Sequence, residues 1–337
     1  MKGKDIYESY FRSAGQTVKM SRSQVKAMIA ESQGISFEQT PALTGLSAEQ
    51  VLQYLNYRKF YELIDKPVPN TIETILNRLK DFSFCNYDAD GWTITNLGAI
   101  LFASNLKYFP TLVGREVVVR KYEGTNNRTL DSDSEFHGKY GYAVGFEGLV
   151  DFIMKKTSKE SISTLREPIP TYPRVAVREF VANALVHQDF AVEGMPITVE
   201  IFSNRLVITN PGAPLNDVNR LIDLPPHSRN ESLAQSLFLL GICERRGSGI
   251  DRAVEAIEKM GLPAAKITKG EQFTRTFIFP KKELKDMSKQ EKVLACYQHA
   301  CLLFEDNLSI NNQSVRERFQ LDKNKSAVAS RIIADTL

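Results

Sequence analysis

The sequence is poor in cysteine, in net charge and in long apolar runs. Four cysteines among 337 residues are too few for a disulfide framework and indicate a reducing compartment, so we expect a cytoplasmic protein. No run approaches the roughly 18 apolar residues of a membrane-spanning helix, and the amino-terminal segment lacks the apolar core of a signal peptide, so we expect no membrane partner. The formal net charge of +3 is too small to hold nucleic acid, so contact with DNA would need a local basic patch.

The sequence also lacks the phosphate-binding pattern GxxxxGK(S/T), which argues against a P-loop helicase. What is present is an average composition, with 42% apolar and 25% charged residues, as in soluble globular domains. The length of 337 residues predicts about two to three such domains.

Proline-rich and lysine-rich segments divide the chain. Pro168, Pro170 and Pro173 mark the clearest boundary, and a lysine-rich break follows Lys281. Before the prolines, helical patterns over 48–64 and 71–80 with a strand pattern at 91–95 suggest a winged-helix-like connector. We expect a mixed α/β (α+β) protein in four segments: a partial domain at 1–44, the helical, winged-helix-like connector at 45–165, a third domain at 166–282 and a helical domain at 288–337.

The segment 175–189 has the pattern of an amphipathic helix. Glu179, Asn183 and His187 recur at four-residue spacing and form a polar stripe opposite an apolar arc. A carboxylate one turn before a carboxamide can orient a water molecule and hold a hard cation, because Mg²⁺ prefers oxygen ligands. An ordinary helix with a solvated face fits the stripe equally well. The arc consists of Ala176, Val177, Phe180, Val181, Ala184 and Leu185.

Two glycine-containing turns follow this helix. Two strands joined at Ser203–Asn204 end in the turn Asn210-Pro211-Gly212, where glycine lets the backbone approach a ligand closely. Later, Gly247 and Gly249 immediately precede a helical pattern, whose backbone amides and dipole can bind an anion.

In this order the motifs resemble a known family. The segments REFVANALVHQDF (178–190), ITNPG (208–212), SRN (228–230) and GSGI (247–250) are similar to those of the GHKL-type ATPases, which have the Bergerat fold. Among these ATPases, the motifs are most similar to those of the RecG-like carboxy-terminal or HATPase-type domain of bacterial predicted transcriptional regulators. The resemblance covers roughly residues 170–280.

The resemblance implies that the domain at 166–282 is a sandwich that binds Mg²⁺ and ATP. It makes Glu179 the general base, Asn183 the magnesium ligand and Ala213–Asn230 a mobile lid over the nucleotide. The implied nucleotide-binding residues are Asn183, His187, Asn210, Gly212, Arg229, Asn230, Gly247, Ser248 and Gly249.

The chain departs from the family at the adenine end of the site. Asn210 replaces the aspartate that accepts a hydrogen bond from the adenine amino group, and Pro211 replaces the asparagine after it. Loss of that charge-assisted bond costs about 1–2 kcal/mol. A degenerate domain that serves only as a scaffold therefore remains an alternative.

The last 50 residues predict a helix-turn-helix. Ser288 and Glu291 form a capping box, Asn312 is a candidate N-cap, and a core is expected from Val315, Phe319, Leu321, Val328 and Ile332. The final helix would present Lys323, Lys325, Ser326 and Arg331 to DNA, although a three-helix protein-binding module fits the same pattern. We expect this winged-helix-type domain to be truncated at its wing.

The amino-terminal segment resembles the closing strand and helix of the AlbA-like domain of Schlafen-related bacterial proteins, of which we expect only the tail. Cys296, His299 and Cys301 point around different faces of a helix, so we expect core cysteines rather than a zinc site.

Together these patterns predict a DNA-binding bacterial transcriptional regulator in which Mg-ATP modulates DNA binding. The alternatives are a Mg-dependent ATPase that acts on nucleic acid or a partner, for example in phage defence, and the non-binding scaffold. The sequence is also compatible with a homodimer.

Overall fold

The computed structural model forms two compact units from interleaved segments of the chain. It describes residues 9–13, 16–19, 25, 36–158, 169–218, 220–222, 227–243 and 248–337. The first unit contains Met1–Arg115, Lys139–Val144 and Asp189–Met195, and the second contains Glu116–Gly138, Gly145–Gln188 and Pro196–Leu337. Both combine helices and strands, so the predicted mixed α+β class is confirmed. None of the helices described is long and apolar enough to cross a membrane.

The first unit begins with a hairpin of β1 (Tyr10–Ser13) and β2 (Gln16–Lys19). The closing helix that the AlbA-like resemblance implies after this hairpin, at 21–32, lies outside the described residues except for Val25. The antiparallel sheet that follows has the order β3-β5-β4. Its elements are β3 (Pro41–Leu46), α2 (Ala48–Tyr54), α3 (Tyr57–Leu63), α4 (Ile72–Asp81), β4 (Cys85–Asp88), β5 (Gly91–Thr95) and α5 (Asn96–Phe102).

The helix predicted over 48–64 is two helices. Leu55 adopts an extended backbone, and the side chain of Asn56 accepts a hydrogen bond from the Lys59 amide at 3.1 Å. Asparagine is a strong N-cap, so it begins a new helix where the apolar periodicity alone predicts a continuous one.

The core of the first unit is aromatic and tightly packed. The rings of Phe60 and Phe84 meet edge to face at 5.6 Å, and every residue of α5 is buried. Gly98 in α5 lies so close to this core that a Cβ atom there would be 2.2 Å from the Phe84 carbonyl oxygen. The close approach therefore requires glycine at this position.

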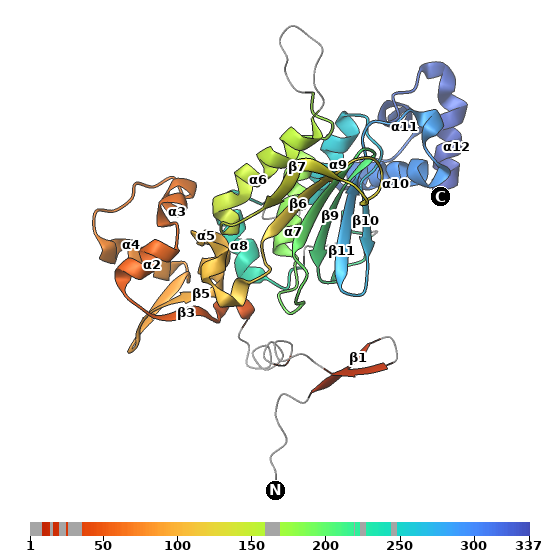
Figure 1. Cartoon of the computed structure of the whole chain (residues 1–337). Coiled ribbons are helices and arrows are strands. Elements are labelled where there is room, and N and C mark those ends of the chain that lie inside the picture. The colour runs from red at the N-terminus through yellow and green to blue at the C-terminus, as the bar shows by residue number, and fades with distance from the viewer. Residues whose placement is uncertain are drawn as a thin grey trace. The chain divides into compact units, whose positions relative to one another are not determined.

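The second unit is built on a six-stranded sheet with the order β10-β11-β9-β8-β6-β7 (Figure 1). All neighbours are antiparallel except β6 and β8, which are parallel. Two of these strands come from within the predicted connector at 45–165, and the four-segment division remains a prediction. The strands are β6 (Val117–Tyr122), β7 (Leu130–His137), β8 (Ile197–Phe202), β9 (Arg205–Pro211), β10 (Lys266–Lys269) and β11 (Phe273–Ile278).

Helices pack on this sheet. They are α6 (Tyr142–Thr157), α7 (Arg174–Val186), α8 (Glu231–Leu239) and α9 (Gly249–Lys259). Helices α7 and α9 lie side by side, and the entire predicted apolar arc of α7 is buried.

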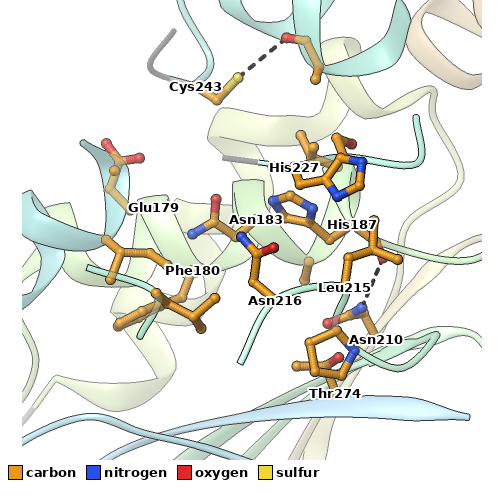
Figure 2. Close-up of a pocket in the computed structure, with 18 of the residues that line it drawn as sticks. Glu179, Phe180, Asn183, His187, Asn210, Leu215, Asn216, His227, Cys243 and Thr274 are labelled. Carbon is orange, nitrogen blue, oxygen red and sulfur yellow. Dashed lines mark hydrogen bonds between the residues drawn. The ribbon is translucent and has the colours of Figure 1, made fainter. Parts of the chain in front are cut away.

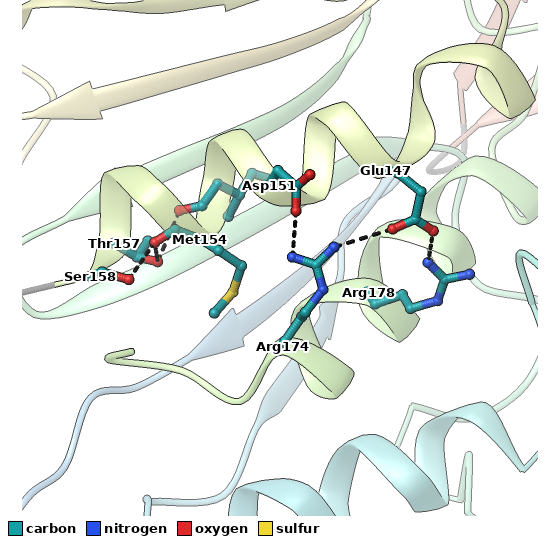
Figure 3. Close-up of polar contacts among 8 residues, drawn as sticks. Glu147, Asp151, Met154, Thr157, Ser158, Arg174 and Arg178 are labelled. Carbon is teal, nitrogen blue, oxygen red and sulfur yellow. Dashed lines mark hydrogen bonds and ion pairs between the residues drawn. The ribbon is translucent and has the colours of Figure 1, made fainter. Parts of the chain in front are cut away.

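Ion pairs hold α7 against α6. Arg174 contacts Asp151 at 2.6 Å and Glu147 at 3.2 Å, and Arg178 also pairs with Glu147 (Figure 3). The second guanidinium nitrogen of Arg178 donates to the Gly241 carbonyl at 2.9 Å. These contacts fix the face that α7 turns toward the rest of the unit.

The chain ends in α10 (Lys289–Glu305), α11 (Asn312–Arg318) and α12 (Ser326–Thr336). The capping box of Ser288 and Glu291 is present as predicted, but the N-cap of α11 is Asn311 rather than Asn312. The core prediction was wrong for Val328, which is 41% exposed, whereas Ala329 is buried with Cys296, Val315 and Ile332. A 3-10 turn at Lys323–Lys325 precedes α12, whose face with Ala329 and Ile332 packs into this core.

Asp251, a partly buried acidic residue, lies on α9 within the electrostatic influence of Glu305 at the end of α10. Burial, and then the charge of Glu305, raise the pKa of Asp251 from 3.8 to about 6. Its Oδ1 atom is buried and has no hydrogen-bond partner within the described part of the chain. The folded protein thus holds this proton more tightly than the unfolded chain does, so Asp251 lowers stability as the pH rises through this range.

We predict that Asp251→Asn raises the thermal unfolding midpoint near neutral pH, because it removes the buried charge beside Glu305. The gain over the unsubstituted protein should largely disappear at about pH 4, because the Asp251 side chain of the folded protein is then protonated and, like asparagine, carries no charge. Asp335→Asn is the control and should lower the unfolding midpoint near neutral pH. Lys289 lowers the pKa of Asp335, so the charge of that carboxylate stabilises the folded protein. Equal gains for Asp251→Asn at both pH values would contradict the assignment.

Candidate functional site

The second unit contains a pocket of about 630 Å³. Its walls are formed by α7, α8, the first residues of α9, strands β9 to β11 and residues 214–216, 221 and 227–229 of the connecting segment. Figure 2 shows that polar side chains from separate parts of the chain line it, among them Glu179, Asn183, His187 and Asn210. The pocket therefore brings together most of the residues that the motifs predicted.

Helix α7 supplies three of these residues. Glu179 and Asn183 lie one turn apart, and His187 caps the carboxyl end of the helix by donating its amide hydrogen to the Asn183 carbonyl at 2.9 Å. The polar stripe was expected on a face opposite the packed arc, but the side chain of Glu179 is only 4% exposed. The reason is α9, which covers this part of the stripe and turns it into a pocket wall.

The Glu179 carboxylate is held against the start of α9. A Cβ atom on Gly249 would lie 2.8 Å from Glu179 Oε2, so a larger residue here would displace the carboxylate from this position. Arg252, one turn further along α9, lies 3.5 Å from Oε1. A cation and a helix amino terminus both stabilise a carboxylate that is buried here.

Asn210 lies near the end of β9 and turns its amide toward the pocket. Its Nδ2 donates to the Pro211 carbonyl at 3.2 Å and, more weakly, to the His187 carbonyl at 3.5 Å. These bonds fix the direction of the amide and leave Oδ1 as an acceptor for a ligand. On β11, Thr274 is the cross-strand partner of Asn210, and its hydroxyl donates to the Gly212 carbonyl at 2.8 Å.

His187 is neutral at physiological pH. Burial, and then the charges of Arg229 and His227, lower the pKa of its imidazole to about 4. It can therefore offer a ligand one donor and one acceptor, but not a positive charge. Arg229 itself is held by a bond from its guanidinium to the Ala213 carbonyl at 3.0 Å, which joins the two ends of the predicted lid.

Other predicted residues lie at turns and helix ends next to the pocket. Gly212 is buried with φ of 100° and forms the turn after β9. Asn230 is buried and donates to the carbonyls of Val186 at 2.8 Å and Gln188 at 2.7 Å, so it attaches the end of the lid to the end of α7. Ser248 is the N-cap residue of α9. Gly247 lies outside the described residues.

Three residues were missed by sequence analysis. Thr274 and His227 line the pocket, and Arg252 contacts Glu179. His227 lies inside the predicted lid, and the alternating pattern of FTRTFIFP gives Thr274 and Thr276 a common face. The position of Arg252 depends on how α9 packs on α7, which the local sequence does not indicate.

A metal ion in the pocket would need ligands beyond the protein. Among the residues described, no group of three or more histidine, cysteine, aspartate or glutamate side chains could hold one. A magnesium ion would instead take the Asn183 oxygen together with water and oxygens of a bound ligand, a set that suits this ion.

The residues predicted to contact DNA lie at the other end of the sequence. Lys323, Lys325, Ser326 and Arg331 are all exposed, on α12 and on the turn that precedes it. Asn312 donates to the Ser326 carbonyl at 2.8 Å and thereby attaches the start of α12 to α11.

Comparison with known proteins agrees with this geometry. Residues 194–278 match the family described as putative ATP-dependent DNA helicase recG C-terminal. A solved structure, the DIP2311 protein from Corynebacterium diphtheriae, is similar in fold, with a TM-score of 0.57 at 17% identity over 96% of this chain. The chain spans 65% of the length of that protein. No curated protein matches the chain significantly.

The matched segment includes β9 to β11, α8, the first turn of α9 and the described lid residues 214–216, 221 and 227–229, which form most of the pocket. Helix α7, with Glu179 and Asn183, precedes the segment and completes the pocket from the neighbouring position on the sheet. Residues 194–278 are therefore similar to the RecG carboxy-terminal domain of HATPase type, as the motifs predicted.

Proposed function

We propose that the pocket of the second unit binds Mg-ATP and that the protein is a DNA-binding regulator whose DNA affinity depends on the nucleotide. The observation that carries the proposal is the convergence of Glu179, Asn183, Asn210 and Gly249 on one pocket of a HATPase-type domain. These residues come from three separate segments of the chain, so their convergence is a property of the fold.

The Asn210 end of the pocket suits an adenine base. Oδ1 of Asn210 can accept a hydrogen bond from the exocyclic amine, because Nδ2 already donates to backbone carbonyls. A carboxylate would bind this amine more strongly, so we expect a weaker site than one with aspartate here. Apolar side chains of the lid and of α8, including Leu215 and Phe238, would cover the faces of the base.

The opposite end of the pocket suits phosphates. Helix α9 has 11 residues and begins at Gly249, so its first amides and its dipole favour an anion. Asn183 would hold magnesium, which supplies a positive charge next to the phosphate oxygens. Arg229 adds a cationic side chain to the lining.

Hydrolysis of the nucleotide is the second candidate function. Glu179 is a buried carboxylate on the pocket wall, and Arg252 and the start of α9 keep it in one orientation. Such a carboxylate can accept a proton from a water molecule that attacks the terminal phosphate. The protein would then be an ATPase that acts on nucleic acid or a partner.

The helix-turn-helix pattern supports the DNA-binding part of the proposal. Lys323, Lys325 and Arg331 are exposed around the start and middle of α12, where they can reach phosphates. The overall charge of +3 means that binding would rest on this local patch.

The first prediction concerns Asn183. Millimolar Mg-ATP should raise the unfolding midpoint of the protein, because a ligand at about 100 times its dissociation constant adds about 2.7 kcal/mol of stability. Asn183→Ala should lose most of this shift, whereas Asn77→Ala, on an exposed face of α4, should keep it. Absence of a shift with ATP, ADP and GTP in the unsubstituted protein would favour the scaffold alternative.

The second prediction separates binding from hydrolysis. If the protein is an ATPase, Glu179→Gln should lower magnesium-dependent phosphate release by about 10²–10⁴-fold while ATP binding persists, because only the proton acceptor is lost. Glu231→Gln is the matched control, since Glu231 also lines the pocket but is exposed. Binding without phosphate release in the unsubstituted protein would leave the regulator as the function.

The third prediction tests DNA binding in a gel-shift titration at low salt. The double variant Lys325→Glu with Arg331→Glu should weaken binding to all DNA sequences and reduce the salt dependence, because it removes phosphate contacts. The control, Lys266→Glu with Lys269→Glu on β10, makes the same charge change at exposed sites elsewhere in the unit. Unchanged DNA affinity in the double variant, or no affinity in the unsubstituted protein with or without ATP, would overturn this part of the proposal.

A further inference from the structure

Helix α9 contacts two functional parts of the second unit. Gly249 and Ile250 in its first turn line the pocket, and Arg252 pairs with Glu179. Its last turn contacts the carboxy-terminal helices, of which α10 packs directly against it (Figure 1). The two contact regions are joined by a single uninterrupted helix of 11 residues.

The contact at the carboxyl end of α9 is a buried charged cluster. Glu258 Oε1 lies 3.0 Å from Arg318 Nε on α11, and Glu258 Oε2 lies 3.0 Å from His299 Nδ1 on α10. The side chain of Arg318 is only 3% exposed, and those of Glu258 and His299 are 14% and 13% exposed. A carboxylate on α9 thus binds one basic side chain from each of two carboxy-terminal helices.

Further polar contacts surround this cluster. Arg318 also donates to the Leu262 carbonyl at 3.0 Å, and Gln298 donates to the Ala265 carbonyl at 2.8 Å. The helices α10 to α12 have a small apolar core of their own, around Cys296 and Val315. Buried polar contacts therefore contribute strongly to how these helices are held on α9.

The amino end of α9 has the opposite character. Asp251 faces α10 with a buried oxygen, and the charge of Glu305 at the end of α10 helps to raise its pKa. The contact between α9 and α10 is therefore attractive near Glu258 and repulsive near Asp251. Such an interface responds to small movements of α9, because a rotation that relieves the repulsion also changes the attractive contacts.

Buried ion pairs depend strongly on geometry. The attraction offsets the cost of desolvation only when the charged groups keep close contact, and loss of one partner leaves the other buried and unpaired. A displacement of α9 at the pocket end would change the contacts of Glu258, because a helix moves as a rigid element.

We propose that α9 couples nucleotide binding to the docking of helices α10–α12, and that the coupling passes through the buried cluster of Glu258, Arg318 and His299. The inference rests on the proposed nucleotide binding and adds the route by which it would reach the helices with the DNA-contact residues. Coupling is reciprocal, so a change in the cluster must also change nucleotide affinity.

The test compares Glu258→Gln with Glu255→Gln in the full chain. Both substitutions remove a carboxylate charge from α9, but Glu255 pairs with Lys259 on the exposed surface at 2.6 Å. Hydrogen exchange of α10–α12 is measured with and without the magnesium complex of a non-hydrolysable ATP analogue, and the affinity for that complex is measured by calorimetry. The double variant Glu258→Gln with Arg318→Gln, which leaves no unpaired buried charge, guards against simple misfolding.

We expect Glu258→Gln to speed exchange in α10–α12, to abolish the nucleotide-dependent change in exchange and to alter affinity by about fivefold or more, with no such effects for Glu255→Gln. The double variant should remain folded and also lack the coupling. Equal affinities and an unchanged nucleotide response in Glu258→Gln would refute the coupling while nucleotide binding stands. Failure of every form to bind the analogue would refute the proposed function and the coupling with it.

Discussion

The pocket depends on the close approach of the first turn of α9 to the carboxylate of Glu179. A carboxylate with only 4% of its side chain exposed is stable only beside compensating charge, which Arg252 and the amino terminus of α9 provide. Because Gly249 has no side chain, the Glu179 carboxylate can lie directly against the start of α9. The same packing closes one wall of the pocket, buries Glu179 and sets the direction in which α9 runs toward the carboxy-terminal helices.

That direction has consequences beyond the pocket. A helix that starts at a ligand-binding wall and ends in a buried charged cluster links two regions that have separate cores. Desolvation lowers the pKa of Arg318, but the nearby Glu258 opposes this effect. The cluster is therefore stable only as a set, and this mutual dependence makes it sensitive to the position of α9.

Local patterns predicted much of this arrangement. Three features depend only on residues that are close together in the sequence, so periodicity and capping chemistry predicted them. They are the arc of α7, the hairpin joined at Ser203–Asn204 and the capping box at Ser288. The parallel pairing of β6 with β8, the burial of Glu179 and its contact with Arg252 join residues that are distant in sequence. The helix predicted over 48–64 is interrupted by the N-cap at Asn56, and Val328 is exposed because the face of α12 with Ala329 and Ile332 packs into the core, and a hydrophobic pattern indicates neither.

Asn210 bears most directly on whether the pocket binds a nucleotide. Replacement of a carboxylate by an amide costs about 1–2 kcal/mol, which corresponds to a roughly five- to thirtyfold higher dissociation constant. The structure reduces the remaining cost, because the amide nitrogen of Asn210 already donates to two backbone carbonyls and its oxygen is left to accept from a ligand. Under the proposed function, a site weakened to this degree would have an occupancy that varies with nucleotide concentration, as a regulatory site requires. The substitution therefore argues less for a lost site than for one whose occupancy is adjustable.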